Sequence, residues 1–292
     1  MRQALIATSL LCIAHAAHSQ EVATSYRSTE VAPGIHALEG DGVFAGGNIS
    51  MLVGDDYNIL IDDGMLSFAP ALLEAATKLA GGPIDFVINT HIHGDHVGGN
   101  AALADSGAVV YAHDNIRRRL LDNPDDAGGP AGLPVITFSD EVTFHVNGME
   151  AFVFHVKRAH TDGDGVIAFR RSNVIHAGDV HFNYLFPYID LDNGGSVAGF
   201  LAAQRRILAM SDDETVIIPG HGKITASRTD LQAAIDMLVD AEARVRALVT
   251  EGKTEEEILT ANPLADYHDT WNWGFITTEK MTRTLYRSLT SE

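Results

Sequence analysis

Residues 90–100 read THIHGDHVGGN and form the most informative stretch of the chain. The stretch closely follows an apolar run at 84–88 that is typical of a buried strand, and within six positions it holds His91, His93, Asp95 and His96. Side chains two positions apart cannot share one face of a helix, but on a tight loop at a strand end they can converge on one ion. Asp95 and His96 can then reach a second ion. The stretch therefore predicts a cluster of metal ligands.

Three further short motifs each follow an apolar, strand-like run, and each adds one candidate ligand. AHTDGD at 159–164 contributes His160, HAGD at 176–179 contributes Asp179, and PGHG at 219–222 contributes His221. These histidines and aspartates offer nitrogen and oxygen donors, which suit zinc and are also accepted by iron and manganese. A polar loop with scattered histidines is the alternative interpretation, and the three added motifs count against it.

Together these residues resemble the metallo-β-lactamase superfamily, whose hallmark is H-x-H-x-D-H followed by a distant His, an Asp and a last His. The resemblance implies two Zn²⁺ ions, with Fe or Mn as alternatives. It also implies that Asp62, in LIDDG, is a buried residue that orients the histidine loop, whereas Asp63 is expected to be a solvated turn residue. By the same resemblance, His91, His93 and His160 hold the first metal, Asp95, His96 and His221 hold the second, and Asp179 bridges both.

The apolar pattern predicts an α/β fold with one domain over residues 20–292. A long amphipathic helix is expected after His221, and Thr254 with Glu257 forms a capping box that opens another. The resemblance sharpens this to an αββα sandwich of two mixed β-sheets flanked by helices, with the metals at one edge. Strands are expected at 49–53, 57–61, 84–89, 108–112, 142–145, 151–156, 166–169, 173–176 and 215–218, and helices at 67–79, 115–121 and 197–210.

Residues 1–19 have the features of a secretory signal peptide: Arg2, an apolar core and small residues before Gln20. The expected location is therefore periplasmic or secreted, and the stretch is too short to be a membrane span. Cys12, the only cysteine, would leave with the signal, so neither a disulfide nor a thiolate ligand is expected. The net charge of −19 and the lack of a basic stripe argue against a nucleic-acid partner. No motif points to an oligomeric state.

The resemblance implies a hydrolase for a small-molecule substrate, in which a metal-bound hydroxide attacks an ester, lactone or amide-type bond. Asp95 is the expected catalytic residue, since it can accept a hydrogen bond from the hydroxide and shuttle its proton. His181 and Tyr184 follow Asp179 closely and are candidates for the substrate cleft.

Three other activities of the superfamily remain open to different degrees. β-Lactam hydrolysis, native or promiscuous, is the main alternative, although true β-lactamases usually have Cys or Ser near the position of Asp179. The glyoxalase branch is disfavoured because the C-terminal tail leans acidic and offers little to bind anionic glutathione, and because export separates the chain from cytosolic glutathione esters. An iron-dependent persulfide dioxygenase-like oxidoreductase is the third, and metal identity distinguishes it.

Overall fold

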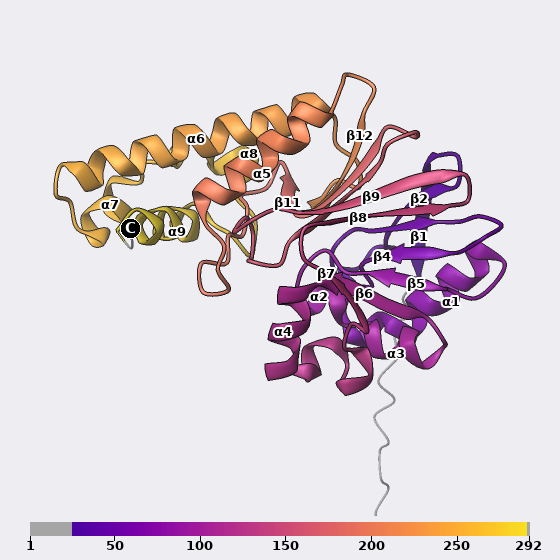
Figure 1. Cartoon of the computed structure of the whole chain (residues 1–292). Coiled ribbons are helices and arrows are strands. Elements are labelled where there is room, and N and C mark those ends of the chain that lie inside the picture. The colour runs from indigo at the N-terminus through magenta and orange to yellow at the C-terminus, as the bar shows by residue number, and fades with distance from the viewer. Residues whose placement is uncertain (1–24, 291–292) are drawn as a thin grey trace, which may run out of the picture.

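Two mixed β-sheets lie face to face in the computed structural model, which describes residues 25–290 (Figure 1). Helices cover the outer face of each sheet. This arrangement confirms the αββα sandwich expected from the sequence. The predicted signal peptide at 1–19 lies outside the described residues.

The first sheet has its strands in chain order. The strands from β1 to β4 pair antiparallel and those from β4 to β7 pair parallel. Parallel neighbours need crossover connections, which short helices supply. The strands are β1 (Tyr26–Ala32), β2 (Ile35–Gly40), β3 (Ile49–Leu52), β4 (Ile59–Ile61), β5 (Phe86–Ile88), β6 (Val109–His113) and β7 (Ile136–Phe138). The connecting helices are η1 (Leu66–Phe68), α1 (Ala69–Ala80), α2 (Gly94–Val97), α3 (Asn100–Asp105), α4 (Asp114–Asp122), η2 (Pro124–Ala127) and η3 (Pro130–Gly132).

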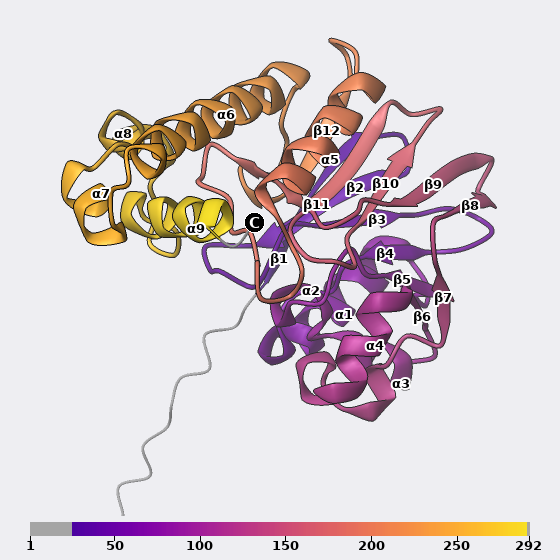
Figure 2. The ribbon, with the colours of Figure 1, turned by 60° about the vertical axis from the view of Figure 1, so that its left-hand side comes forward.

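The second sheet has the order β12-β11-β10-β9-β8 and is antiparallel except for the pair β11 and β12. Figure 2 shows α5 and α6 beside this sheet, with α7, α8 and α9 grouped against α6. The strands are β8 (Glu141–Val146), β9 (Met149–His155), β10 (Gly165–Phe169), β11 (Val174–Asn183) and β12 (Val216–Gly222). The helices are α5 (Val197–Met210), α6 (Arg228–Thr250), α7 (Glu255–Ala261), η4 (Ala265–Tyr267), α8 (His268–Trp271) and α9 (Thr278–Thr290).

Three apolar layers hold the sandwich together. Branched side chains such as Leu52 and Ile61 of the first sheet and Ile167 of the second fill the space between the sheets. The outer layers pack α1 and α3 on the first sheet and α5 and α6 on the second.

Among the helices within residues 25–290, none combines the length and apolar character that crossing a bilayer requires.

Strand β11 is longer than the sequence pattern predicts. The expected strand stops at His176, but the observed strand continues to Asn183 and is buried throughout. Its pairing with β12 advances four residues, from Gly178 to Phe182, while β12 advances two, from Pro219 to His221. This bulge interrupts the alternation of side chains and places Asp179 beside the end of β12.

Gly178 shows why the bulge needs glycine. Its φ is 51°, and an added Cβ would lie 2.7 Å from Oγ1 of Thr90. Thr90 cannot easily move, because its hydroxyl donates to Asp62 and contacts His91. The bulge in β11 and the histidine loop therefore fix each other's position.

We expect Gly178→Ala to lower the free energy of unfolding by about 2–4 kcal/mol, since it adds a clash to the cost of positive φ. The matched control is Gly148→Ala, where φ is 68° and an added Cβ meets nothing within 4 Å. That change should cost only about 1 kcal/mol. Urea titration of both variants measures the difference, and equal losses would contradict the proposed contact.

Candidate metal centre

All seven predicted metal ligands lie together at one edge of the sandwich. His91 and His93 follow β5, Asp95 and His96 lie in α2, and His160 lies in the loop between β9 and β10. Asp179 comes from β11 and His221 from β12. Strands of both sheets therefore contribute to one site, as the sequence predicts.

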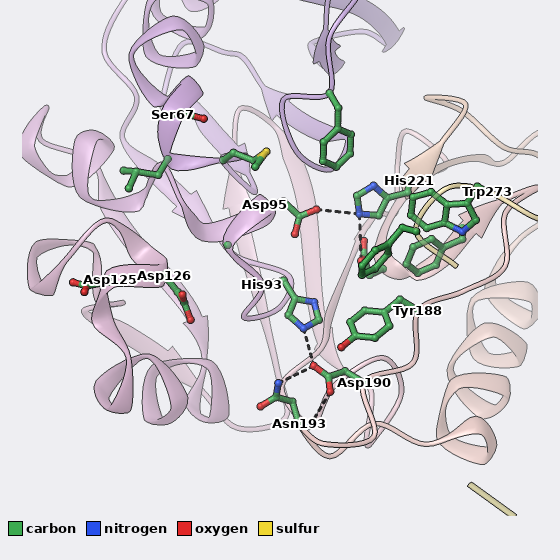
Figure 3. A pocket seen from close by; sticks show the side chains of 17 residues that line it. Ser67, His93, Asp95, Asp125, Asp126, Tyr188, Asp190, Asn193, His221 and Trp273 are labelled. Atoms are coloured by element: carbon green, nitrogen blue, oxygen red, sulfur yellow. Dashed lines mark hydrogen bonds and ion pairs between the residues drawn. The ribbon is translucent and has the colours of Figure 1, made fainter. Parts of the chain in front are cut away.

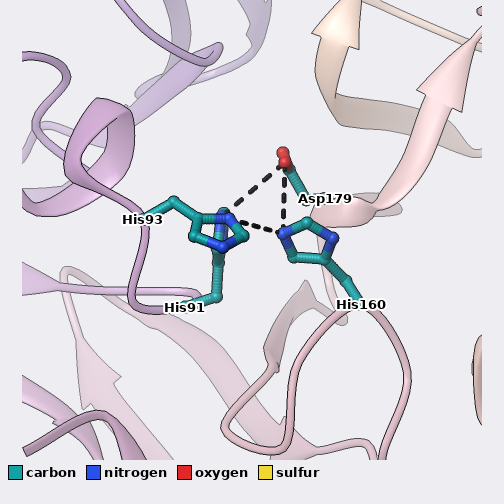
Figure 4. A group of neighbouring side chains, drawn as sticks. All are labelled: His91, His93, His160 and Asp179. Carbon is teal, nitrogen blue, oxygen red and sulfur yellow. Dashed lines mark hydrogen bonds and ion pairs between the residues drawn. The ribbon is translucent and has the colours of Figure 1, made fainter. Parts of the chain in front are cut away.

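The first group of donors contains His91, His93, His160 and Asp179 (Figure 4). Nε2 of His160 lies 2.9 Å from Nδ1 of His93 and 3.5 Å from Oδ2 of Asp179. Nε2 of His91 lies 3.7 Å from the same oxygen. Donors about 2 Å from a tetrahedral ion are about 3.3 Å apart, so the spacing fits a metal such as zinc.

The second group contains Asp95, His96 and His221. Nε2 of His221 lies 3.3 Å from Oδ2 of Asp95 and 3.4 Å from Nε2 of His96. Asp179 also reaches this group, with Oδ1 3.2 Å from His96 and Oδ2 3.4 Å from His221. The carboxylate of Asp179 therefore contacts both groups, which is the position a bridging ligand requires.

Four of the five histidines are oriented by a hydrogen bond from the ring nitrogen that points away from the group. A neutral imidazole that donates through one nitrogen carries a lone pair on the other. In that neutral form the lone pairs of these rings face one another, an arrangement that a cation stabilises. The four pairs are His91 with Thr90 Oγ1 (3.0 Å), His93 with Asp190 (2.9 Å), His96 with Asp62 (2.7 Å) and His160 with the carbonyl of Tyr188 (2.7 Å).

Charge and burial also fit a bound cation. Burial lowers the pKa of His160 to about 4 and that of His91 well below its usual value, so both rings are neutral near pH 7. Burial disfavours the charged form of His221 too, but Asp179 and Asp95 outweigh it and raise its pKa to about 9. Nε2 of His91 is buried and has no hydrogen-bond partner within the described residues. A metal ion would therefore supply the positive charge that stabilises the buried carboxylates.

Asp62 makes the contacts expected of a residue that orients the histidine loop. Its carboxylate is fully buried and accepts hydrogen bonds from the amide and hydroxyl of Thr90 and from Nδ1 of His96. Asp63 was expected in solvent, and that expectation is wrong. Its side chain is fully buried, accepts from the amide of Gly99, and has a pKa raised well above the usual value by burial.

His181 and Tyr184 do not face the cavity beside the site, so their assignment to a substrate cleft is corrected. His181 is fully buried, and neither of its ring nitrogens has a hydrogen-bond partner among residues 25–290. Tyr184 packs against Trp271 and is partly exposed. The bulge in β11 is the physical reason, because it turns His181 away from the side that carries Asp179.

Asp190 is a site residue that the sequence analysis missed. Its carboxylate accepts a hydrogen bond from Nε2 of His93, and its amide donates to the carbonyl of His160. Asn193 donates to the same carboxylate through its backbone and side chain. Burial opposes ionisation, but these donors lower the pKa of Asp190. No spacing rule marks this residue, which lies in an irregular loop after β11.

The site opens into a cavity of about 1190 Å³ (Figure 3). His93, Asp95, Asp179 and His221 form part of its wall. The rest is mostly apolar and comes from residues that the sequence analysis did not assign to the site. These residues are Phe44, Met65, Leu66, Phe182, Tyr188, Trp273 and Phe275.

A metal-binding site at the edge of an αββα sandwich defines the class of protein. The chain belongs to the metallo-beta-lactamase superfamily, whose family model matches residues 42–221 and so includes all seven candidate ligands. It is accordingly a metal-dependent hydrolase.

Two known proteins illustrate the similarity. The chain is 30% identical over 198 residues to a hydroxyacylglutathione hydrolase from Polaromonas sp., covering 64% of this chain and 70% of that protein. A metallo-beta-lactamase structure from Pontibacter korlensis superposes with a TM-score of 0.65 and 18% identity, covering 74% of this chain and all of that one. The structural likeness supports the fold alone.

We expect Asp190→Asn to weaken metal binding about 10–100-fold, because an amide is a poorer acceptor for the His93 ring. Competition with a chromogenic chelator measures the affinity. The control is Asp192→Asn, since the Asp192 side chain is 76% exposed and pairs with Arg287. Unchanged affinity in the Asp190 variant would remove its orienting role.

We expect His181→Leu to raise the free energy of unfolding by about 1 kcal/mol, since it removes two buried ring nitrogens that have no hydrogen-bond partner in the described part of the chain. Thermal and urea denaturation measure the effect. Replacing the exposed His145 in the same way should change stability by less than about 0.5 kcal/mol. A clear loss of stability in the His181 variant would show that the ring has a partner.

Proposed function

We propose that the protein is a binuclear zinc hydrolase that cleaves an acyl bond, such as an ester, lactone, thioester or amide-type bond, in a small molecule. The observation that carries this proposal is the position of Asp179, whose carboxylate lies within 3.7 Å of histidines in both donor groups. One carboxylate between two sets of imidazole donors is suited to a pair of zinc ions.

Bound zinc ions would lower the pKa of water to about 7 and polarise the carbonyl oxygen of the substrate. The chain's own residues supply position and proton transfer. His91, His93 and His160 would hold one ion, Asp95, His96 and His221 the other, and Asp179 would touch both.

Asp95 is best placed to move a proton. Its side chain is 25% exposed, lines the cavity, and lies beside the Nε2 atom of His221. It is ionised at neutral pH: burial opposes this, but His96 and His221 lower its pKa to about 2. A carboxylate in this position can accept the proton of the attacking water and pass it to the leaving group.

The thioester belongs among the candidate bonds because the relative from Polaromonas sp. is a hydroxyacylglutathione hydrolase. Attack on a thioester, an oxoester or a lactone uses the same groups, since each bond presents a carbonyl carbon and a leaving heteroatom. Hydrolysis of an acyl bond at this site therefore does not require one particular leaving group.

The first experiment is metal analysis of the purified protein together with initial rates on a chromogenic cephalosporin, an aryl ester, a homoserine lactone and a thioester. We expect about two zinc ions per chain, turnover of at least one substrate, loss of activity with a chelator and recovery with zinc. One iron per chain and no hydrolysis would contradict the proposal and favour oxygen chemistry.

We expect Asp95→Asn to retain the fold and most of the metal but to lower kcat about 10²–10⁴-fold, because the amide cannot accept the proton. Initial rates and metal content of the same preparation give both quantities. Asp105→Asn, an exposed change at the end of α3, is the control. Near wild-type turnover in the Asp95 variant would refute its role.

A further inference from the structure

We propose that the substrate has a bulky apolar acyl group and carries no net negative charge. This inference rests on the proposed hydrolase function and concerns which molecules enter the cavity.

Aromatic rings surround the metal-site histidines. His221 lies between Phe44 and Phe182, with ring centroids 5.9 and 5.3 Å away and planes within 24°. Trp273 lies 6.1 Å from the same ring, and Tyr188 lies 5.5 Å from His93. An acyl group whose carbonyl carbon is at the metal site would therefore contact aromatic surface directly.

Several apolar side chains of this wall are largely exposed to solvent, as is expected of a surface that a ligand covers. Phe44 is 61% exposed, Leu66 is 54% exposed and Phe275 is 49% exposed, and all three line the same cavity. Apolar side chains that gather around one concave surface mark a binding site more often than single exposed ones do. Burial by an apolar ligand would remove this area from water.

The cavity wall also selects on charge. It contains Asp95, Asp179 and Asp190, and Asp125 and Asp126 lie across the cavity from Trp273 (Figure 3). No Lys or Arg is among the residues that line it within the described part of the chain. Asp95 and Asp179 would offset only half of the charge of two divalent ions, so a positive charge stays at the reaction centre; farther out, Asp125 and Asp126 have no Lys or Arg beside them among the described residues of the wall.

A glutathione thioester differs in charge from the substrate that we propose. Its glutathione group carries two carboxylates and one ammonium, and hence a net charge of −1. Buried or partly buried carboxylates without a cationic partner are costly, and like charges add repulsion. A neutral thioester with the same acyl chain avoids both costs.

The test compares three thioesters with the zinc-loaded protein: S-octanoyl-N-acetylcysteamine, S-acetyl-N-acetylcysteamine and S-octanoylglutathione. We expect kcat/KM for the first to exceed that for each of the others by about tenfold or more, since six methylenes become buried and a net charge is avoided. A glutathione ester or an acetyl ester hydrolysed equally well would overturn the inference.

Variants connect the preference to the wall. Phe44→Ala and Phe275→Ala remove exposed rings without opening the core, and each should reduce the octanoyl-to-acetyl ratio several-fold. Val135→Ala is the control, because Val135 is 71% exposed and lies outside the cavity. An unchanged ratio in both Phe variants would contradict the role of the wall.

A binding measurement separates this inference from the proposed function. The chain has two tryptophans, of which Trp271 is buried and Trp273 lines the cavity. In a Trp271→Phe variant, the fluorescence of Trp273 should respond saturably to octanamide but not to acetamide. Saturation without hydrolysis of any thioester or ester would support the apolar site and reject the hydrolase, whereas hydrolysis without saturation or chain-length preference would reject the inference alone.

Discussion

The hydrogen bonds to the buried carboxylate of Asp62 are the constraint on which the site depends. Burying an ionised carboxylate costs several kcal/mol unless donors surround it, and Asp62 accepts from Thr90 twice and from His96 once. Thr90 in turn contacts His91 and lies against Gly178 in the bulge of β11. One carboxylate at the end of β4 therefore fixes the ring directions of two histidines and the approach of the second sheet, so the donor groups form only where the two sheets meet.

The site combines two environments with opposite demands. Around Asp179, carboxylates and oriented imidazole rings favour the binding of a cation. A few ångströms away, Phe44, Phe182 and Trp273 present apolar surface and no cationic side chain. Water excluded by the aromatic side would strengthen the electrostatic interactions of the polar side, because the local dielectric falls. The apolar wall would consequently strengthen the electrostatic interactions that the proposed reaction uses.

The polar half of the site was predictable from sequence, and the apolar half largely was not. His91 and His160 lie in loops after strands, whereas Asp179 lies inside β11, and it was the resemblance of the motifs to the superfamily pattern that predicted one shared site for all three. Strands β1 and β2 escaped prediction because exposed polar residues such as Glu30 hide their alternation. The continuation of β11 was hidden by its bulge, and the side chain of His181 was misplaced for the same reason. Asp190, Phe44 and Trp273 reach the site through tertiary packing, although the aromatic run WNWGF at 271–275 was a usable signal.

The segment that carries Trp273 and Phe275 lies more than fifty residues beyond His221, outside the region matched by the family model. It is attached to the loop after β11 by few polar contacts, among them the indole of Trp273 donating to the carbonyl of Phe186. Evolution could therefore exchange this segment while the residues that hold the reaction centre remain untouched. A few mutations at Trp273 and Phe275 could therefore change the apolar wall while Trp271 and Ile276 keep the segment packed on the core.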